Sequence, residues 1–188
     1  MSNDRYLVVV SGPSGSGKDT VVQRLMQLHP EIEISVSATT RPKRPGEKEG
    51  VNYYYTTAPD FEQRIAAGAI LEYTRYCGNY YGTPKAEVDR RIAAGATVVL
   101  VIEVVGAGNI KRLYPGATTI FVRPPSYAEL EERLRGRGTE SEDVIQKRLA
   151  RAVEEMDYAA DYDEVVVNDD VDRCAAEIYE LIQKRQHT

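Results

Sequence analysis

The chain has 188 residues, enough for one domain with a substantial hydrophobic core. Its apolar content of 42% and charged content of 28% are close to those of globular proteins, and its apolar runs are too short to cross a bilayer. A net charge of −5 argues against general nucleic-acid binding. The N-terminal segment has an early acid and no small-residue cleavage site, so we expect no signal peptide and a cytoplasmic protein.

Apolar runs alternate with helix-like segments along much of the chain. Strands are expected at 6–11, 97–105, 118–122 and 164–167, and helices at about 18–28, at 85–94 and after residue 170 to about 184. This alternation predicts an α/β fold with a doubly wound, mostly parallel sheet that binds ligands at the carboxyl ends of its strands. The core of this single domain is expected to comprise about 1–34, 85–125 and 163–188.

Two segments interrupt the alternation. Residues 35–84 are rich in Tyr, Arg, Thr and Gly and contain only short extended pieces, which suggests a small β-rich insertion. Residues 126–162 are charged and helical, with Ser126 as a predicted N-cap and a second start at the capping-box sequence 139–142. The second segment carries five arginines, Arg133, Arg135, Arg137, Arg148 and Arg151.

The stretch GPSGSGKDT follows the first apolar run and matches the phosphate-binding pattern G-x-x-x-x-G-K. Its glycines let successive backbone N–H groups turn toward one anion, and the following helix adds its positive N-terminal end. Lys18 is expected to span the β- and γ-phosphates, whereas a merely tight turn would not need it. The predicted nucleotide-binding residues are Gly12, Pro13, Ser14, Gly15, Ser16, Gly17, Lys18, Asp19 and Thr20.

Asp19 stands where the pattern has a Ser or Thr that binds Mg²⁺. A carboxylate is a hard oxygen ligand and is favoured at a helix N-terminus, so Asp19 is our predicted metal residue, acting directly or through a water. Its negative charge faces a polyphosphate, however, and the metal must offset that repulsion. Thr20 offers a hydroxyl about 100° further round the helix and is a poorer substitute.

Hydroxyl and guanidinium groups gather in the sequence between residues 35 and 53. Arg41 and Arg44 could form a fork around a second phosphate, with Ser37 and Tyr53 as hydroxyl donors. The alternative is a solvated basic loop. Beside a phosphate-binding loop, the second phosphate site is the favoured interpretation.

Eight sequence motifs between about residue 8 and residue 170 closely resemble those of the guanylate kinase family, in its soluble enzyme form. They are GPSGSGK, SVSATTRPKRPGE, GVNYYY, ILEY, GNYYGTPK, RPPS, ERLRGRGTESEDVIQKRL and VVVNDD. The resemblance implies a P-loop NTPase fold with a five-stranded sheet, a GMP-binding insertion and a helical lid. It implies Mg-dependent transfer of the ATP γ-phosphoryl group to GMP or dGMP in purine nucleotide metabolism. The sequence is compatible with a monomer or a homodimer.

The resemblance also implies roles for individual residues. The GMP phosphate would be held by Ser37, Arg41, Arg44, Tyr53 and Tyr81, and guanine would be read by Glu72, Thr83 and Glu103. Guanine presents two adjacent donors, N1–H and N2–H₂, which one carboxylate can accept, so Glu72 is the predicted specificity residue. Catalytic charge would come from Lys18, Arg41, Arg44 and the lid arginines Arg133, Arg137 and Arg148, with Asn168 contacting adenine. Arg135 and Arg151 are interpreted as a solvated face.

The sequence departs from the family phrase D-x-D-x-Q-G at Val101-Ile102-Glu103-Val104-Val105-Gly106. By the strand period of two, Glu103 would share a face with residue 101 and replace the second acid. Val101 cannot replace the first acid, and Val105 cannot hydrogen-bond as Gln would. We therefore hypothesise that Asp19 supplies the negative charge that the strand lacks at Val101.

Two other functions compete with the kinase. A binding module could keep GMP or a phosphopeptide without transferring phosphate, and the altered metal positions favour it slightly. Lys18, the lid arginines and Asn168 oppose it, because a module that only binds does not need an ATP site. A P-loop kinase for another phosphorylated acceptor is the third interpretation, against which Glu72, Thr83 and Glu103 together argue.

Overall fold

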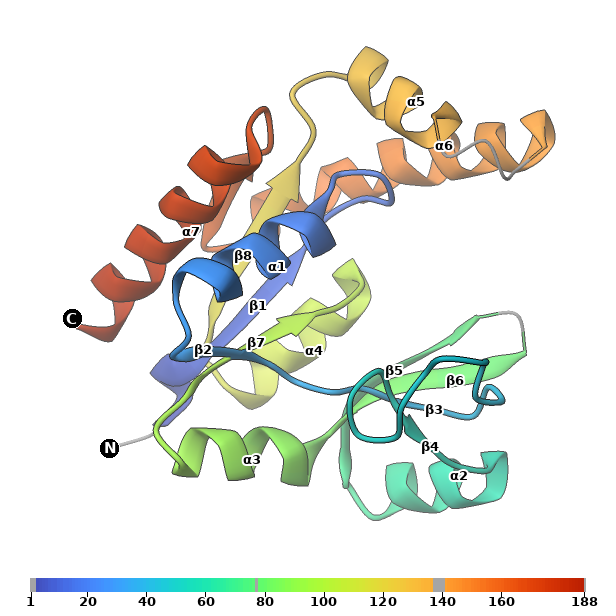
Figure 1. Cartoon of the computed structure of the whole chain (residues 1–188), viewed down its shortest axis with the longest axis vertical. Helices are drawn as coiled ribbons and strands as arrows, with labels where there is room; N and C mark the ends of the chain where they lie inside the picture. The colour runs from blue at the N-terminus through green and yellow to red at the C-terminus, as the bar shows by residue number, and fades with distance from the viewer. Residues whose placement is uncertain (1–2, 77, 137–140, 188) are drawn as a thin grey trace.

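The computed structural model describes residues 3–76, 78–136 and 141–187, and in these ranges a five-stranded parallel sheet forms the centre of the fold (Figure 1). The strand order β2-β7-β1-β8-β9 places β1, the strand before the phosphate-binding loop, in the middle. The strands are β1 (Leu7–Ser11), β2 (Ile32–Ile34), β7 (Thr97–Val101), β8 (Thr118–Arg123) and β9 (Glu164–Val167). The predicted α/β fold with a five-stranded sheet is therefore confirmed.

Helices cover both faces of this sheet. They are α1 (Lys18–Leu28) and α7 (Val171–Gln186) on one face, and α3 (Lys85–Ala93) and α4 (Val104–Leu113) on the other; η1 (Asn3–Tyr6) precedes β1. Successive side chains of β1 alternate between the faces, so Val8 and Val10 pack toward α1 and α7, while Leu7 and Val9 pack toward α3 and α4. No helix of the described residues is both long and apolar enough to span a membrane.

A second, four-stranded sheet lies between β2 and α3 in the sequence, at the lower right of Figure 1. Its order is β4-β3-β6-β5, with β3 (Ala38–Thr39), β4 (Tyr54–Tyr55), β5 (Ile70–Tyr76) and β6 (Asn79–Pro84). Helix α2 (Ala58–Ala66), capped by Thr57, closes its core by burying Phe61 against Ala38 and Ile70. The sequence showed the extended pieces of this segment but not the helix.

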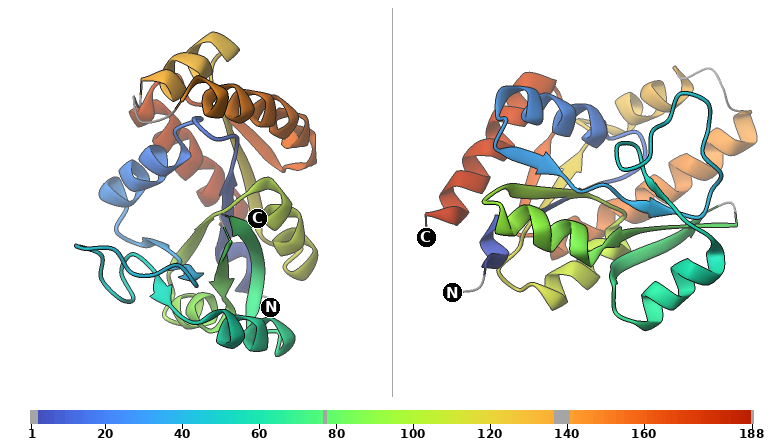
Figure 2. Two further views of the ribbon diagram at one scale, coloured as in Figure 1. Left: turned by 90° about the vertical axis from the view of Figure 1, so that its right-hand side faces the viewer. Right: turned by 60° about the horizontal axis from the view of Figure 1, so that its bottom comes forward.

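The segment after β8 forms α5 (Tyr127–Arg135), α6 (Glu142–Met156) and η2 (Asp157–Asp161), with α5 and α6 at the top of Figure 1. Ser126 caps α5 as predicted, because its hydroxyl accepts from Glu129 N at 3.2 Å. The two helices share a core of their own, made of Leu130, Leu134, Ile145, Leu149 and Ala152. The left view of Figure 2 has this pair at the top and the four-stranded sheet at the bottom, with the central sheet between them.

The sequence predicted a strand at 97–105, but the strand in the structure, β7, is shorter. It ends at Val101, and α4 begins at Val104 with Glu103 as its N-cap. Valines favour strands, so the run of Val and Ile gave no signal for the break; burial of Ala107 and Ile110 against the sheet decides the local structure instead. The sequence predicted no strand at the position of the short β2.

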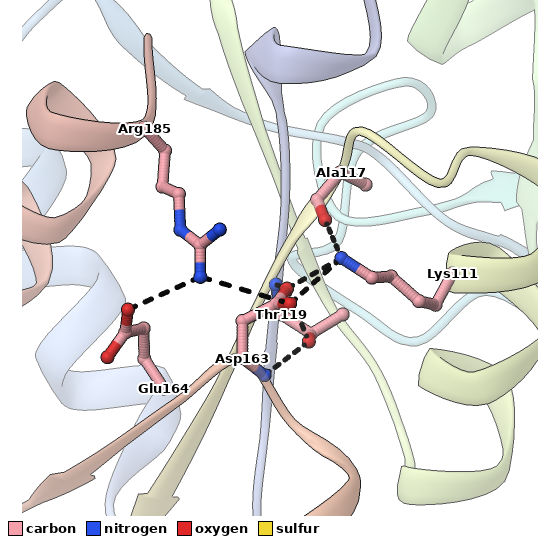
Figure 3. A network of polar contacts seen from close by, with 6 residues as sticks. All are labelled: Lys111, Ala117, Thr119, Asp163, Glu164 and Arg185. Carbon is pink, nitrogen blue, oxygen red and sulfur yellow. Dashed lines mark hydrogen bonds and ion pairs between the residues drawn. The ribbon is translucent and has the colours of Figure 1, made fainter. Parts of the chain in front are cut away.

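A partly buried carboxylate, that of Asp163, fixes the junction between α4, β8 and the residue before β9 (Figure 3). Asp163 accepts hydrogen bonds from Thr119 N at 2.9 Å, from Thr119 Oγ1 at 2.9 Å and from Lys111 Nζ at 2.7 Å. Burial alone would raise the pKa of Asp163, but the hydrogen bonds from Lys111 and Thr119 outweigh it and lower this pKa below its ordinary value. The charge therefore stabilises the alignment of β9 with β8.

Candidate active site

The predicted phosphate-binding loop connects the end of β1 to the start of α1. Gly17, the N-cap of α1, has a φ of 83°, and a Cβ there would lie 2.4 Å from Asn168 Nδ2. Only glycine therefore fits between the loop and the end of β9. The turn is closed by a hydrogen bond from Ser16 N to Pro13 O at 3.0 Å, which leaves the helix N-terminus open toward the loop.

Residues from two distant segments hold this loop by its backbone. The buried Asn168 donates from Nδ2 to Ser16 O at 2.8 Å, and Arg133 donates to the same oxygen at 3.2 Å. Arg133 also donates to Asn168 O at 2.9 Å. Within the described residues, Ser16 Oγ is buried without a hydrogen-bond partner, so its hydroxyl can donate a hydrogen bond to a bound ligand.

The predicted lid arginines are only partly accounted for. Arg133 lies on the loop, and Arg148 of α6 donates to Ser14 Oγ at 2.8 Å. Arg137 lies outside the described residues. Two arginines from different helices thus reach the loop, where positive charge can stabilise a phosphoryl group.

A pocket of about 310 Å³ joins the loop to the four-stranded sheet, and we call it the shared pocket. It is lined by Lys18, Asp19, Ser37, Tyr53, Glu72, Thr74, Tyr81, Gly82, Val101, Ile102 and Glu103. Most of the residues predicted to bind the acceptor therefore meet at one place. A larger hollow of about 440 Å³ lies between α4 and η2, and because no residue of the loop lines it, we do not assign the chemistry there.

Glu72 is the buried acid of the shared pocket, with 6% of its surface exposed. Thr83 Oγ1 donates to Glu72 Oε1 at 2.6 Å. On the other side α4 approaches closely, since a Cβ at Gly106 would lie 2.7 Å from Glu72 Oε2. Burial raises the pKa of Glu72 and the charge of Glu103 raises it further, although the Thr83 hydrogen bond opposes both.

Arg41 is held in a carboxylate clamp next to this pocket. Its guanidinium donates to Glu47 Oε1 at 2.7 Å and to Glu47 Oε2 at 3.1 Å, and it lies 5.4 Å from the centre of the Tyr53 ring. Glu47 Oε2 also accepts from Arg44 N at 2.8 Å and from Tyr55 OH at 2.8 Å. These hydrogen bonds, that of Arg41 first, lower the pKa of Glu47 to about 2.

The structure brings Arg44 to the same loop but not into the shared pocket. Its side chain is exposed, and the contact to Glu47 comes from its backbone. Tyr53 and Tyr81, by contrast, line the shared pocket and pack edge to face with ring centres 5.9 Å apart. Of the residues predicted to hold the acceptor phosphate, Ser37, Tyr53 and Tyr81 therefore line the shared pocket, Arg41 lies beside it, and the Arg44 side chain is exposed.

Asp19 and Val101 line the same pocket. The hypothesis that Asp19 on the loop supplies the charge missing at Val101 on the strand, an exchange between loop and strand, requires this proximity. Asp19 is exposed in the first turn of α1, and Thr20 beside it is exposed too. Glu103 also lines the pocket, but not by the strand alternation predicted from the sequence, because β7 ends at Val101. Its place at the N-cap of α4 turns the side chain toward the pocket edge.

The fold and the site define a class. A phosphate-binding loop after the central strand, with lid arginines and a second, acid-bearing pocket, is the arrangement of a P-loop kinase that acts on a small acceptor. The family model described as guanylate kinase matches residues 4–185. The chain therefore belongs to the guanylate kinase family, whose enzymes are nucleoside monophosphate kinases.

Individual relatives agree with this assignment. A guanylate kinase of Synechococcus sp. (strain CC9902) is 49% identical over 95% of this chain and 95% of its own length, and one of Synechocystis sp. (strain ATCC 27184 / PCC 6803 / Kazusa) is 49% identical over 96% and 94%. The crystal structure of guanylate kinase from Anaplasma phagocytophilum superposes with a TM-score of 0.76 at 32% identity, covering 97% of this chain and 86% of that one. A shikimate kinase of Bacteroides thetaiotaomicron shares the fold alone, with a TM-score of 0.51 at 15% identity over 94% of this chain and 98% of that one.

Three residues of the site were given no functional role from the sequence, and one of them, Arg151, was interpreted as part of a solvated face. Glu47 clamps Arg41, Gly106 lets α4 approach Glu72, and Arg151 contacts Glu103. An acid close in sequence to two arginines was a local signal for Glu47. For Gly106 and Arg151 no local signal exists, because their partners are far away in the chain.

Proposed function

We propose that this protein is a guanylate kinase, which transfers the γ-phosphoryl group of MgATP to GMP or dGMP and yields ADP and GDP or dGDP. The observation that carries the proposal is Glu72, a buried carboxylate in the same pocket as Lys18 of the phosphate-binding loop. A buried acid is costly unless a basic group or a ligand pairs with it, and guanine offers the two adjacent donors that a carboxylate accepts.

The acceptor is read by the segment 35–84 together with Glu103. Glu72 accepts from guanine N1–H and N2–H₂, and Glu103 receives the remaining amino hydrogen. The Thr83 hydroxyl, which donates to Glu72 without substrate, turns its one hydrogen to guanine O6. The phosphate of GMP is bound by Ser37, Arg41, Arg44, Tyr53 and Tyr81. The Glu47 clamp supports this assignment, because it fixes the plane of the Arg41 guanidinium before the substrate arrives.

The donor is bound by the loop from Gly12 to Thr20, and Asn168 contacts adenine. Support comes from the buried, unpartnered Ser16 Oγ among the described residues and from the open N-terminus of α1. The segment 126–162 is the lid, from which Arg133, Arg137 and Arg148 spread positive charge along the phosphoryl group and exclude water. Transfer is in line, with no covalent intermediate on the protein.

Mg²⁺ enters with ATP as part of the substrate. The chain fits a metal held mainly by phosphates and waters, since the described residues contain no cluster of three His, Cys, Asp or Glu side chains able to hold it. Asp19 is the one carboxylate of the loop, and we propose that it faces this metal and offsets the acid that Val101 does not provide. When bound, Mg²⁺ neutralises charge on the β- and γ-phosphates.

The test is ADP production with GMP, dGMP, AMP, CMP, UMP and ribose phosphates, each with and without Mg²⁺. We expect turnover of GMP and dGMP only, and only with the metal. Tight GMP binding without turnover of any acceptor would identify a binding module instead. Turnover of another acceptor but not GMP would identify a kinase of different specificity.

We also propose that the enzyme works in the cytoplasm, where ATP and GMP are found together. The predicted oligomeric state is a monomer or a homodimer. Sedimentation at several protein concentrations decides between them.

A further inference from the structure

One ion pair joins the lid segment to the shared pocket. Arg151 of α6 donates from Nη2 to Glu103 Oε2 at 2.5 Å. Glu103 lines the shared pocket, and Arg151 stands on the helix that packs against α5. The contact therefore links two segments that are separated in sequence by α4, β8 and α5.

The guanidinium of Arg151 is aimed by a second acid. Its Nε donates to Glu155 Oε1 at 2.8 Å, one helical turn further along α6. Glu155 has only 6% of its surface exposed, so the direction of this hydrogen bond is fixed by packing. Arg151 thus contacts a buried acid on its own helix and an acid at the pocket edge.

The same helix also touches the phosphate-binding loop. Arg148, three residues before Arg151 and hence on a neighbouring position of the same face, donates to Ser14 Oγ at 2.8 Å. Helix α6 therefore contacts the donor loop through Arg148 and the acceptor pocket through Arg151.

We propose that Arg151 is a positioning residue that holds the Glu103 carboxylate at the pocket edge, where the acceptor binds. Through this contact, Arg151 couples acceptor binding to the packing of α6 on the donor loop. The inference rests on the proposed function, because it takes GMP as the acceptor. Arg151 occupies one carboxylate oxygen of Glu103, so the other can accept from the acceptor.

Coupling of this kind is reciprocal. If GMP binds better when Glu103 is held by α6, then GMP favours the seated helix and raises the affinity of the loop for ATP by the same factor. The side chains of Arg151 and Glu103 are 56% and 49% exposed, and an exposed ion pair shifts an equilibrium by about two- to fivefold. The effect must also shrink with added salt.

The experiment measures the dissociation constant of GMP with and without a non-hydrolysable ATP analogue, in the parent, Arg151→Met and the matched control Arg135→Met. Arg135 is an arginine of α5 in the same segment, paired with Glu131 at 2.8 Å and with Glu142, away from the shared pocket. We expect the analogue to tighten GMP binding in the parent and in Arg135→Met. In Arg151→Met, the ratio of the GMP dissociation constants without and with the analogue should be about two- to fivefold smaller. The KM for GMP should rise by the same factor, with kcat nearly unchanged.

A double-mutant cycle with Glu103→Gln isolates the pair. Once Glu103 is neutral, Arg151→Met should change the coupling no further. Equal coupling in Arg151→Met and Arg135→Met, or a loss that is as large at 0.5 M salt as at low salt, would overturn the inference. A parent that does not turn over GMP would instead refute the proposed function, so the two failures are distinguishable.

Discussion

The donor and acceptor sides of the site are built from different chemical groups. On the donor side the loop is held by its backbone, with Ser16 O accepting from Asn168 at 2.8 Å and from Arg133 at 3.2 Å. On the acceptor side the contacts run between side chains, from Thr83 to Glu72 at 2.6 Å and from Arg41 to Glu47 at 2.7 Å.

This difference has a consequence for specificity. Backbone N–H groups around a phosphate are much the same for any nucleotide, so the donor side selects a chemical class. Side-chain carboxylates and hydroxyls present particular donors and acceptors, so the acceptor side selects one base. Substitutions on the acceptor side should therefore change which substrate is used, while those on the donor side should change the rate and the metal dependence.

The largest effect is expected from Glu72→Gln. An amide would direct a donor at guanine N1–H or N2–H₂, and a site built for a hydrogen bond loses roughly 10⁴- to 10⁵-fold in kcat/KM when the partner is mismatched. The unfolding midpoint should stay or rise, because the folded state raises the pKa of Glu72 and ionising it at neutral pH costs stability. Steady-state kinetics and thermal unfolding measure the two.

The matched control for Glu72→Gln is Glu62→Gln. Glu62 lies in the same segment, is exposed and accepts from Tyr80 OH at 2.9 Å outside the shared pocket. It should leave GMP turnover within about twofold, as exposed substitutions usually do. If Glu72→Gln behaved like this control, guanine would not be read by Glu72, and the division between the two sides would fail.

Asp19→Ser tests the donor side. If Asp19 carries the charge that Val101 lacks, then restoring a serine at this position should remove most of the activity, about tenfold or more, and raise the Mg²⁺ concentration needed for half-maximal rate. A Mg²⁺ titration by calorimetry with bound ATP gives a readout independent of turnover. The KM for GMP should change little, in contrast with Glu72→Gln.

Asp60→Ser is the control for Asp19→Ser, because Asp60 also stands in the first turn of a helix but far from the loop. It should keep the parental rate and Mg²⁺ dependence. Asp19→Ser with a parental rate and an unchanged Mg²⁺ titration would end the hypothesis of an exchange between loop and strand.

Glu47→Gln should have a smaller effect, confined to the acceptor phosphate. The substitution weakens the charged hydrogen bonds that fix Arg41, and we expect the KM for GMP to rise about tenfold with little change in the KM for ATP. Because the pKa of Glu47 is lowered to about 2, the clamp stays charged at every assay pH above 4.

Glu49→Gln, in the same loop, is the control for Glu47→Gln. Its carboxylate accepts from Tyr55 N at 3.2 Å rather than from an arginine. A lower KM for GMP in Glu47→Gln would mean that Glu47 competes with the phosphate for Arg41 instead of positioning it.

The sequence predicted the donor side better than the acceptor side for a physical reason. The loop is contiguous, so Gly12 to Lys18 could be identified from their spacing, and the predicted limits of α1 agree with the structure. The break between β7 and α4 could not be seen, because packing of α4 against the sheet overrides the strand preference of Val104 and Val105. The pair of Arg151 and Glu103 is separated by 48 positions and is brought together only by the fold.

The smallest effect on catalysis is expected from Asp163→Asn, a change that tests the scaffold beneath both sides. Asp163 lies outside the loop and the shared pocket and accepts from Lys111 and Thr119. Its lowered pKa stabilises the fold at pH values above the ordinary 3.8, and this contribution is lost as the pH falls toward the folded-state pKa. Asp163→Asn should therefore lower the free energy of unfolding by about 1–3 kcal/mol at pH 7, constantly down to about pH 5 and then less in more acidic solution.

Urea unfolding between pH 7 and pH 3.5 measures this dependence, with Asp161→Asn as the exposed neighbouring control. The KM values for GMP and ATP should be unchanged at temperatures where Asp163→Asn is folded, because the ends of β1 and β7 keep their positions. A selective rise in one KM would mean that the alignment of β9 with β8 sets the geometry of that side. Asn168 follows β9 directly and donates to Ser16 O, so a shift of β9 would move the phosphate-binding loop. The KM for ATP is therefore the one that would rise, because the loop is held through its backbone.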